Sequence, residues 1–123
     1  MRSENGVILT NVERIPGYEI SEMLGLVQGS TIRAKHAGRD FMAGLKNIVG
    51  GELKGYTQLL QESRVEATNR MIAQAKELGA NAVINVRYTT SSVAQGASEI
   101  LAYGTAVSLA PTAPAAYQTP PVL

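Results

Sequence analysis

The chain of 123 residues contains no cysteine, no tryptophan and a single histidine, His36. The absence of cysteine excludes disulfide bonds, thiolate metal sites and cysteine nucleophiles within this chain, and one imidazole cannot complete the usual ligand sets of zinc or copper. We therefore expect no cofactor, with His36 as a weak candidate metal ligand. Symmetry leaves one alternative open, because several copies of His36 or of a carboxylate around a central axis could supply the missing ligands.

The sequence also lacks an excess of basic or acidic residues, and it lacks long apolar runs. Eleven basic and ten acidic side chains leave a formal net charge of +1, and the five tyrosines and one phenylalanine are not interleaved with basic residues. We therefore expect no nucleic-acid partner. No segment approaches the roughly 20 apolar residues that span a bilayer, and the N-terminus lacks the apolar core of a signal peptide. The expectation is a cytoplasmic protein with no membrane partner.

The residues that are present predict a single α+β domain over residues 1–109. Residues 18–32 alternate in short apolar runs broken by Gly25 and Gly29, which predicts either a strand with a bulge or a kinked pair of strands, after a turn at Pro16-Gly17. Apolar residues at helical spacing then predict a short helix over residues 40–49, begun by Asp40. Residues 110–123 are rich in proline and alanine, and we interpret them as an extended tail that is either disordered or held by another subunit.

A stripe of residues spaced by three or four predicts a second, long helix of about six turns. Glu66 and Arg70 are spaced for an ion pair on its solvated side, where Gln74 is also placed, and Gly79 is the expected C-cap. The small residues in the middle of the stripe predict close packing against a sheet or a neighbouring helix. The stripe comprises Tyr56, Leu60, Ser63, Ala67, Met71, Ala75 and Leu78.

Two strands are predicted after the long helix. Residues 80–90 alternate, which would place Ala82, Ile84, Val86 and Tyr88 on one face. The segment SSVAQGAS is turn-like, and EILAYGTAVSL predicts a second strand that pairs antiparallel with the first.

The stretch KNIVGGELKGYTQ, residues 46–58, raises the question of a phosphate-binding loop. Such a loop follows a strand and ends in Gly-Lys-Ser/Thr at the start of a helix. Here the glycines follow a predicted helix, and Lys54 is followed by Gly55 and Tyr56. We interpret the stretch as a turn between two helices.

Five blocks, in order, are similar to the YbjQ-like family of small bacterial proteins, a family labelled as heavy-metal-binding and without an established function. They are PGYEI, GLVQGSTI, RDFMAGLKNIVGGELKGY, SRVEATNRMIAQAKELGANAVINVRY and YGTAV. Two positions depart from the family pattern, Glu52 where arginine is common and Ser63 where alanine is common. The resemblance implies a β-α-β-β subunit with a small antiparallel sheet, assembled into a homopentameric ring.

The same motifs retain Arg39, Asp40, Tyr56 and Arg64. These residues form either a network that locks the two helices together or a ligand-anchoring site between subunits. Glu62 and Glu66 could act as an acid and a base, but the stripe places them on the solvated face, and no Gly-x-Ser-x-Gly elbow is present. We expect a non-enzymatic binding or scaffolding protein. The alternative is a metal-ion or small-molecule binding protein with sites between subunits, which would also allow an enzyme.

Overall fold

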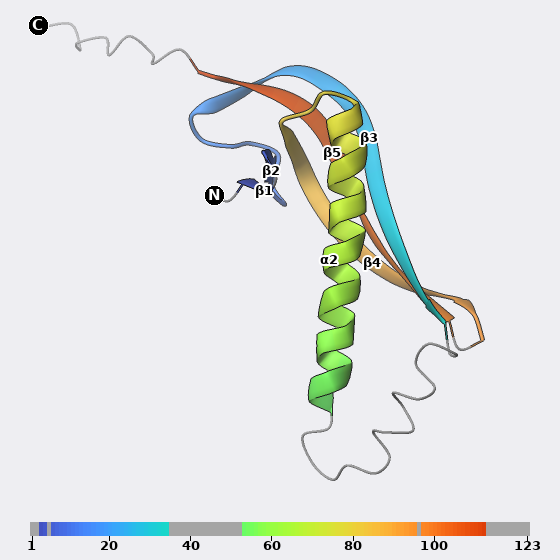
Figure 1. Cartoon of the computed structure of the whole chain (residues 1–123). Coiled ribbons are helices and arrows are strands. Elements are labelled where there is room, and N and C mark those ends of the chain that lie inside the picture. Colours follow the sequence, from blue (N-terminus) through green and yellow to red (C-terminus); the bar gives the residue numbers. More distant parts are fainter. Residues whose placement is uncertain (1–2, 5, 35–52, 96, 113–123) are drawn as a thin grey trace, which may run out of the picture.

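The computed structural model describes residues 3–4, 6–34, 53–95 and 97–112. Its strands form one five-stranded sheet in the order β1-β2-β4-β5-β3, and helix α2 lies along one face of the sheet (Figure 1). The predicted α+β class is confirmed, whereas the predicted short helix over residues 40–49 lies outside the described residues. The elements are β1 (Ser3–Glu4), β2 (Val7–Leu9), β3 (Tyr18–Ala34), α2 (Leu53–Glu77), β4 (Ala82–Ala94) and β5 (Ala97–Pro111).

The three long strands are antiparallel, as predicted. β5 lies between β4 and β3, and its pairing with β3 runs from Tyr18↔Pro111 to Ala34↔Ala97. Strand β4 extends to Ala94, so the predicted turn is much shorter than the segment SSVAQGAS. The sheet is mixed, however, because β2 pairs parallel with β4. The prediction of a purely antiparallel sheet was wrong, since strands of two or three residues carry no periodic signal.

Strand β3 is bent by two irregularities in its pairing with β5. The register shifts between Ile20 and Glu22 and again between Met23 and Gly25. Gly25 has a φ of 127°, which side chains rarely tolerate, so glycine suits this position. Of the two predicted alternatives, the structure shows one strand with bulges rather than a kinked pair of strands. Before the strand, the Tyr18 amide donates to the Ile15 carbonyl oxygen at 3.1 Å across the predicted turn.

Strand β4 contains a bulge at Asn85, which has a left-handed φ of 54°. Ile84 pairs with Thr105 and Arg87 pairs with Tyr103, so two residues of β4 oppose one residue of β5. Asparagine adopts this conformation more readily than most residues. The bulge reverses the face on which the later side chains of β4 lie.

This reversal places Val86 and Tyr88 on the same face as Val83. Val83 and Val86 belong to the core cluster beneath α2, and the Tyr88 hydroxyl lies 2.8 Å from the Thr68 hydroxyl of the helix. The prediction that Ile84, Val86 and Tyr88 share one face was therefore wrong. Simple alternation assumes an unbroken ladder, and one extra residue moves every following side chain to the other face.

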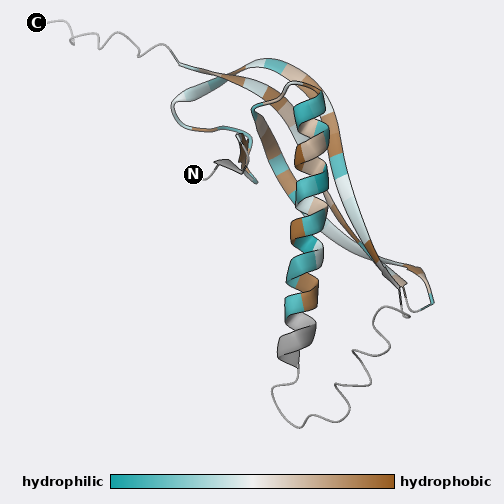
Figure 2. Ribbon diagram, viewed as in Figure 1, coloured by the Kyte–Doolittle hydropathy of each residue, from teal (hydrophilic) through white to brown (hydrophobic). Residues whose placement is uncertain are grey.

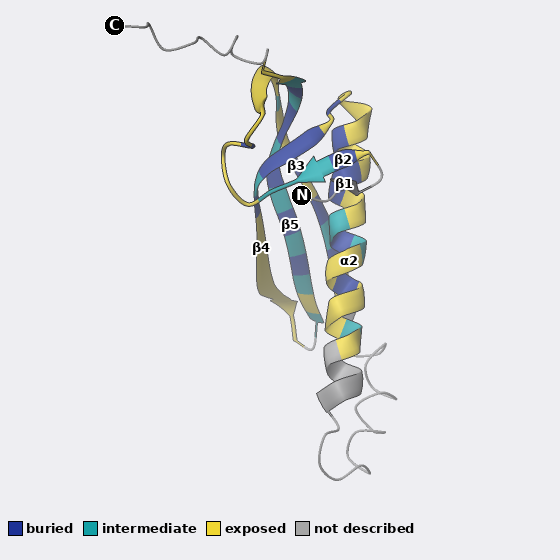
Figure 3. Ribbon diagram, turned by 90° about the vertical axis from the view of Figure 1, so that its left-hand side faces the viewer, coloured by how far each residue is buried: buried dark blue, intermediate teal, exposed yellow. Residues whose placement is uncertain are grey.

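The main core lies between α2 and the sheet. Ser63, Ala67, Met71 and Ala75 are completely buried, which confirms the middle of the predicted stripe, whereas Leu60 and Leu78 near its ends stay partly exposed. The outer side of the helix is mostly exposed and largely polar, with Val65 as an exposed apolar residue on it (Figures 2 and 3). A second, smaller cluster lies on the other face of the sheet, where Ile15 packs against β4 and β5.

Helix α2 ends as predicted at Gly79, which has a φ of 80°. The Gly79 amide donates to the Lys76 carbonyl oxygen at 2.9 Å. The Ala80 amide donates to the Ala75 carbonyl oxygen at 3.0 Å. These two bonds form a Schellman motif, which satisfies carbonyl groups left free in the last turn. Within the described residues, no helix combines the length and the apolar character needed to cross a bilayer.

Candidate functional site

The closest contact between the helix and the sheet occurs at Gly29 of β3. A Cβ atom at this position would lie only 2.3 Å from both the Ala67 carbonyl oxygen and the Met71 amide nitrogen. Two backbones therefore approach one another directly, which requires glycine on the strand and a small residue, Ala67, on the helix. The predicted close packing of the small residues in the stripe is confirmed.

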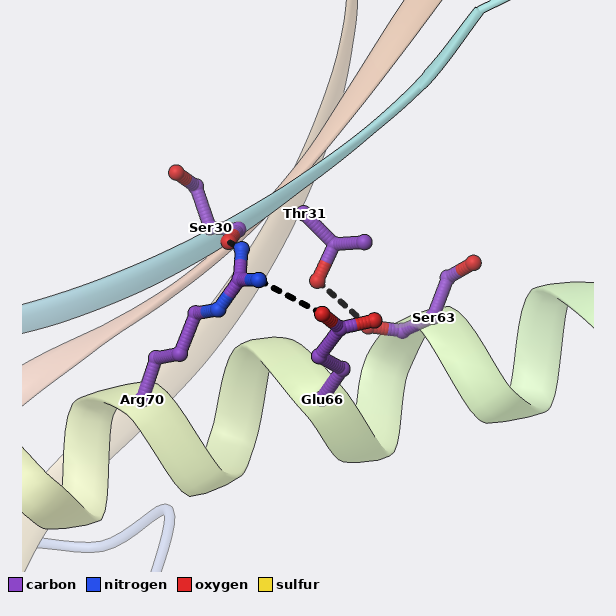
Figure 4. Close-up of polar contacts among 5 residues, drawn as sticks. All are labelled: Ser30, Thr31, Ser63, Glu66 and Arg70. Carbon is purple, nitrogen blue, oxygen red and sulfur yellow. Dashed lines mark hydrogen bonds and ion pairs between the residues drawn. The ribbon is translucent and has the colours of Figure 1, made fainter. Parts of the chain in front are cut away.

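Buried hydroxyl groups extend this contact toward the N-terminal half of α2. The Thr31 hydroxyl donates to the Ser63 carbonyl oxygen at 3.0 Å (Figure 4). The Ser63 hydroxyl donates to the Leu59 carbonyl oxygen at 2.9 Å. Both side chains are almost fully buried, so these bonds offset the desolvation of their polar groups.

Helix side chains also cover part of the outer edge of β3, the last strand of the sheet. Arg70 donates through Nη1 to the Ser30 carbonyl oxygen and through Nη2 to Glu66 Oε1, at 2.5 and 2.6 Å (Figure 4). The Gln28 amide donates to Gln74 Oε1 at 2.7 Å. These contacts satisfy backbone groups that would otherwise be open to another strand.

The predicted ion pair between Glu66 and Arg70 is confirmed, and both side chains are partly exposed. Gln74 was placed on the exposed side of the helix, which is confirmed, but its side chain also accepts the Gln28 amide of β3, a contact that was not predicted. Periodicity along α2 could not reveal this contact, since it depends on where the edge of the sheet lies. The one feature of the sequence that could have indicated this contact is a long polar side chain directly beside the buried stripe.

Most of the predicted site residues lie outside the part of the chain that the structure describes. His36, Arg39 and Asp40 lie outside the described residues, and so does the side chain of Tyr56. Arg64 is described and lies exposed on α2, where its carbonyl oxygen accepts the Thr68 hydroxyl at 2.7 Å. Neither the helix-locking network nor the ligand-anchoring site is tested by these positions.

The carboxylates that could act on a substrate sit on an open surface. Glu62 and Glu66 both line a shallow hollow of about 580 Å³ on the outer face of α2, and every residue that lines it comes from this one helix. Glu66 is already paired with Arg70. Among the described residues, no group of three or more histidine, cysteine, aspartate or glutamate side chains could hold a metal ion. The hollow is therefore an open surface rather than an enclosed reaction site.

A surface that sequence reasoning missed lies on the face of the sheet opposite α2. Leu26 pairs with Thr105, whereas the neighbouring Val27 is buried beneath the helix. Met23, Leu26 and Ile32 are 62%, 70% and 57% exposed. We call the surface formed by these three residues the open face. Three large apolar side chains exposed on one uncovered face make it a candidate interaction surface, although Gln28 and Ser30 lie between Leu26 and Ile32.

Comparison with known sequences identifies the relatives of this chain. Residues 7–110 match the YbjQ family, which is described as "Putative heavy-metal-binding". The chain belongs to the YbjQ family. Within it, the chain is 66% identical to a UPF0145 protein from Hahella chejuensis over 101 residues, which are 82% of this chain and 97% of the relative. It is 58% identical to a UPF0145 protein from Archaeoglobus fulgidus over 106 residues, 86% of this chain and 98% of that relative.

A solved structure shares the fold of this YbjQ-family chain. It is a protein of unknown function from Pediococcus pentosaceus that belongs to the DUF74 family. The two structures superimpose with a TM-score of 0.57 at 16% sequence identity, covering 85% of this chain and 99% of the other. The resemblance inferred from the sequence blocks is confirmed at the level of the family, and the solved structure shows the fold alone.

Proposed function

We propose that this YbjQ-family protein is a non-enzymatic binding or scaffolding subunit that assembles into a homopentameric ring. The observation that carries the proposal is the open face, because Met23, Leu26 and Ile32 expose large apolar side chains on a sheet face that α2 does not cover. Burial of such side chains against another copy would be favourable by about 25 cal/mol per Å² of apolar surface. The ring of five is what the family resemblance implies.

Unpaired strand edges give further support. Among the described residues, β2 pairs with β4 only at Ala82 and Val83. The stretch of β4 from Arg87 to Ala94 therefore has a described strand on one side only, and its side chains are exposed. β3 occupies the opposite edge of the sheet. Open edges of this length invite pairing with another chain. Each copy thus offers an apolar face and the exposed edge of β4 for contact with its neighbours, whereas Arg70 and Gln74 cover part of the β3 edge.

The assembly is tested by native mass spectrometry and light scattering of the purified protein. We expect a species of about 65 kDa, since five chains of 13.0 kDa give that mass. Leu26→Glu is expected to release smaller species, because it places a charge in the apolar contact. Val65→Glu, on the exposed outer face of α2, is the matched control and should leave the ring intact. A mass of one chain for the unchanged protein at micromolar concentration would contradict the proposal.

The family description favours a second candidate function, the binding of a metal ion or small molecule between subunits. The residues described here form no metal-binding cluster, so such a site would draw ligands from several copies or from other parts of the chain. We nevertheless expect the protein to purify without stoichiometric zinc or copper, because it has no thiol and one histidine. Elemental analysis after desalting measures this. Stoichiometric metal that disappears in His36→Ala would favour the second candidate instead.

A further inference from the structure

The outer edge of β3 carries little of the protection that edge strands usually have in their own sequence. Residues 23–32, MLGLVQGSTI, contain no charged residue and no proline. After the second register shift, the pairing of β3 with β5 continues without interruption to Ala34. Charged residues, prolines and bulges are common means of keeping an edge strand from pairing with another chain. The stretch from Leu26 to Ile32 is therefore a regular edge that a further strand could extend.

Two side chains of α2 occupy backbone groups of this edge. The Gln28 amide donates to Gln74 Oε1 at 2.7 Å, and Arg70 Nη1 donates to the Ser30 carbonyl oxygen at 2.5 Å (Figure 4). Residues two apart in a ladder present their backbone groups to the same edge, so a neighbouring strand would use this same amide and this same oxygen. Gln74 thus replaces the acceptor of such a strand, and Arg70 replaces its donor.

The position of the helix and an ion pair hold Arg70 over the edge. A Cβ atom at Gly29 would lie 2.7 Å from the Arg70 Cβ atom, so the arginine side chain starts directly against the strand. Arg70 Nη2 lies 2.6 Å from Glu66 Oε1, one turn earlier on α2. This pair orients the guanidinium group while its Nη1 atom reaches the strand. The contact is therefore built from three parts, a glycine, an ion pair and an amide.

We propose that Arg70 and Gln74 block the β3 edge against strand addition by a second copy, and so confine strand pairing between copies to the edge of β4. Residues 88–94 of β4 also contain no charge and no proline, and their side chains are exposed. A contact between two different edges is head-to-tail, and it builds open chains of molecules wherever its rotation does not close a ring. With β3 blocked, the β4 edge of one copy cannot continue the sheet of the next copy.

This inference rests on the proposed function in one respect, the use of the β4 edge as a contact surface between copies. It does not depend on the number of chains in the assembly, because each variant is compared with the unchanged protein. A mass other than five chains for the unchanged protein would contradict the ring and leave this comparison intact.

The test is light scattering over a concentration series of Arg70→Met/Gln74→Leu, which removes the donor and the acceptor. We expect the mean mass to rise with concentration, at least about twofold above that of the unchanged protein, because strand addition joins whole copies. Gln61→Leu/Lys76→Met is the matched control, since it removes one amide and one positive charge from exposed positions of the same helix. An unchanged mass in the first variant, or an equal rise in the control, would overturn the proposal.

Two further variants separate the blocking of an edge from a general loss of structure. Arg70→Lys/Gln74→Glu keeps a donor and an acceptor at the same net charge as Arg70→Met/Gln74→Leu, and its mass should stay that of the unchanged protein. Gln74→Leu alone leaves the arginine contact in place and should give a smaller rise, with circular dichroism as the check on folding. A rise in the conservative variant as large as that in Arg70→Met/Gln74→Leu would overturn the proposal.

The edge that adds to β3 is identified by a proline in β4. The Val86 amide donates to the Thr10 carbonyl oxygen, so the amide of Thr90, four residues later, points to the same outer edge. A proline is tolerated there, because only the outward amide of an edge strand is lost. Thr90→Pro added to Arg70→Met/Gln74→Leu should return the mass to that of Thr90→Pro alone. Persistence of the larger species would show that β4 is not the edge involved and would overturn the proposal.

Discussion

Gly29→Ala is expected to lower the free energy of unfolding by about 3 kcal/mol, the upper part of the usual range for overpacked sites. The added Cβ atom would lie 2.3 Å from backbone atoms of both Ala67 and Met71. No side-chain rotation relieves this overlap, because the atoms belong to the helix backbone. The helix has to move away from β3, which would also stretch the contacts of Arg70 and Gln74 with the strand edge.

Urea denaturation at a fixed protein concentration measures this loss, since assembly makes apparent stability depend on concentration. Ser30→Ala is the matched control on the same strand. The Ser30 side chain points away from α2 (Figure 4), and the carbonyl oxygen that accepts Arg70 is kept. The control should change stability by no more than about 0.5 kcal/mol, as is usual for surface substitutions. Equal behaviour of the two variants would show that α2 does not lie on β3 at Gly29.

Ala67→Leu should destabilise the protein by about 1–3 kcal/mol through overpacking. Ala67 is completely buried, and its carbonyl oxygen is one of the atoms closest to Gly29, so no space exists for a larger side chain. We expect a lower melting temperature, measured by circular dichroism. A shift of the assembly toward smaller species, measured by size-exclusion chromatography, is expected to accompany it.

The matched control is Ala73→Leu, the same substitution on the same helix. Ala73 is exposed and lies on the outer face of α2, so a leucine there has room. Gln74→Leu would be a poorer control, because it removes the acceptor of the Gln28 amide. If Ala73→Leu costs as much stability as Ala67→Leu, the buried side of the helix is assigned to the wrong residues.

Local patterns in the sequence predicted most of the elements, and they did so for physical reasons. The spacing of Ser63, Ala67, Met71 and Ala75 can bury one side of a helix only at 3.6 residues per turn, so the pattern fixed both the element and its buried side. Gly79 stops that helix because a left-handed C-cap favours glycine. The candidate site could be predicted from the sequence less well than the fold. Of its predicted residues, only Arg64 has a described side chain, and it lies exposed.

The sequence by itself determined the α+β class, the long helix, the three long strands and the family, because each depends on residues close in the chain or on blocks of matching residues. Tertiary structure decided the parallel pairing of β2 with β4 and the reversal of faces at Asn85. It also decided that Arg70 and Gln74 cover the edge of β3. These features join residues far apart in the chain or depend on one inserted residue in a ladder. Periodicity within one segment carries no information about which distant backbone group lies opposite it.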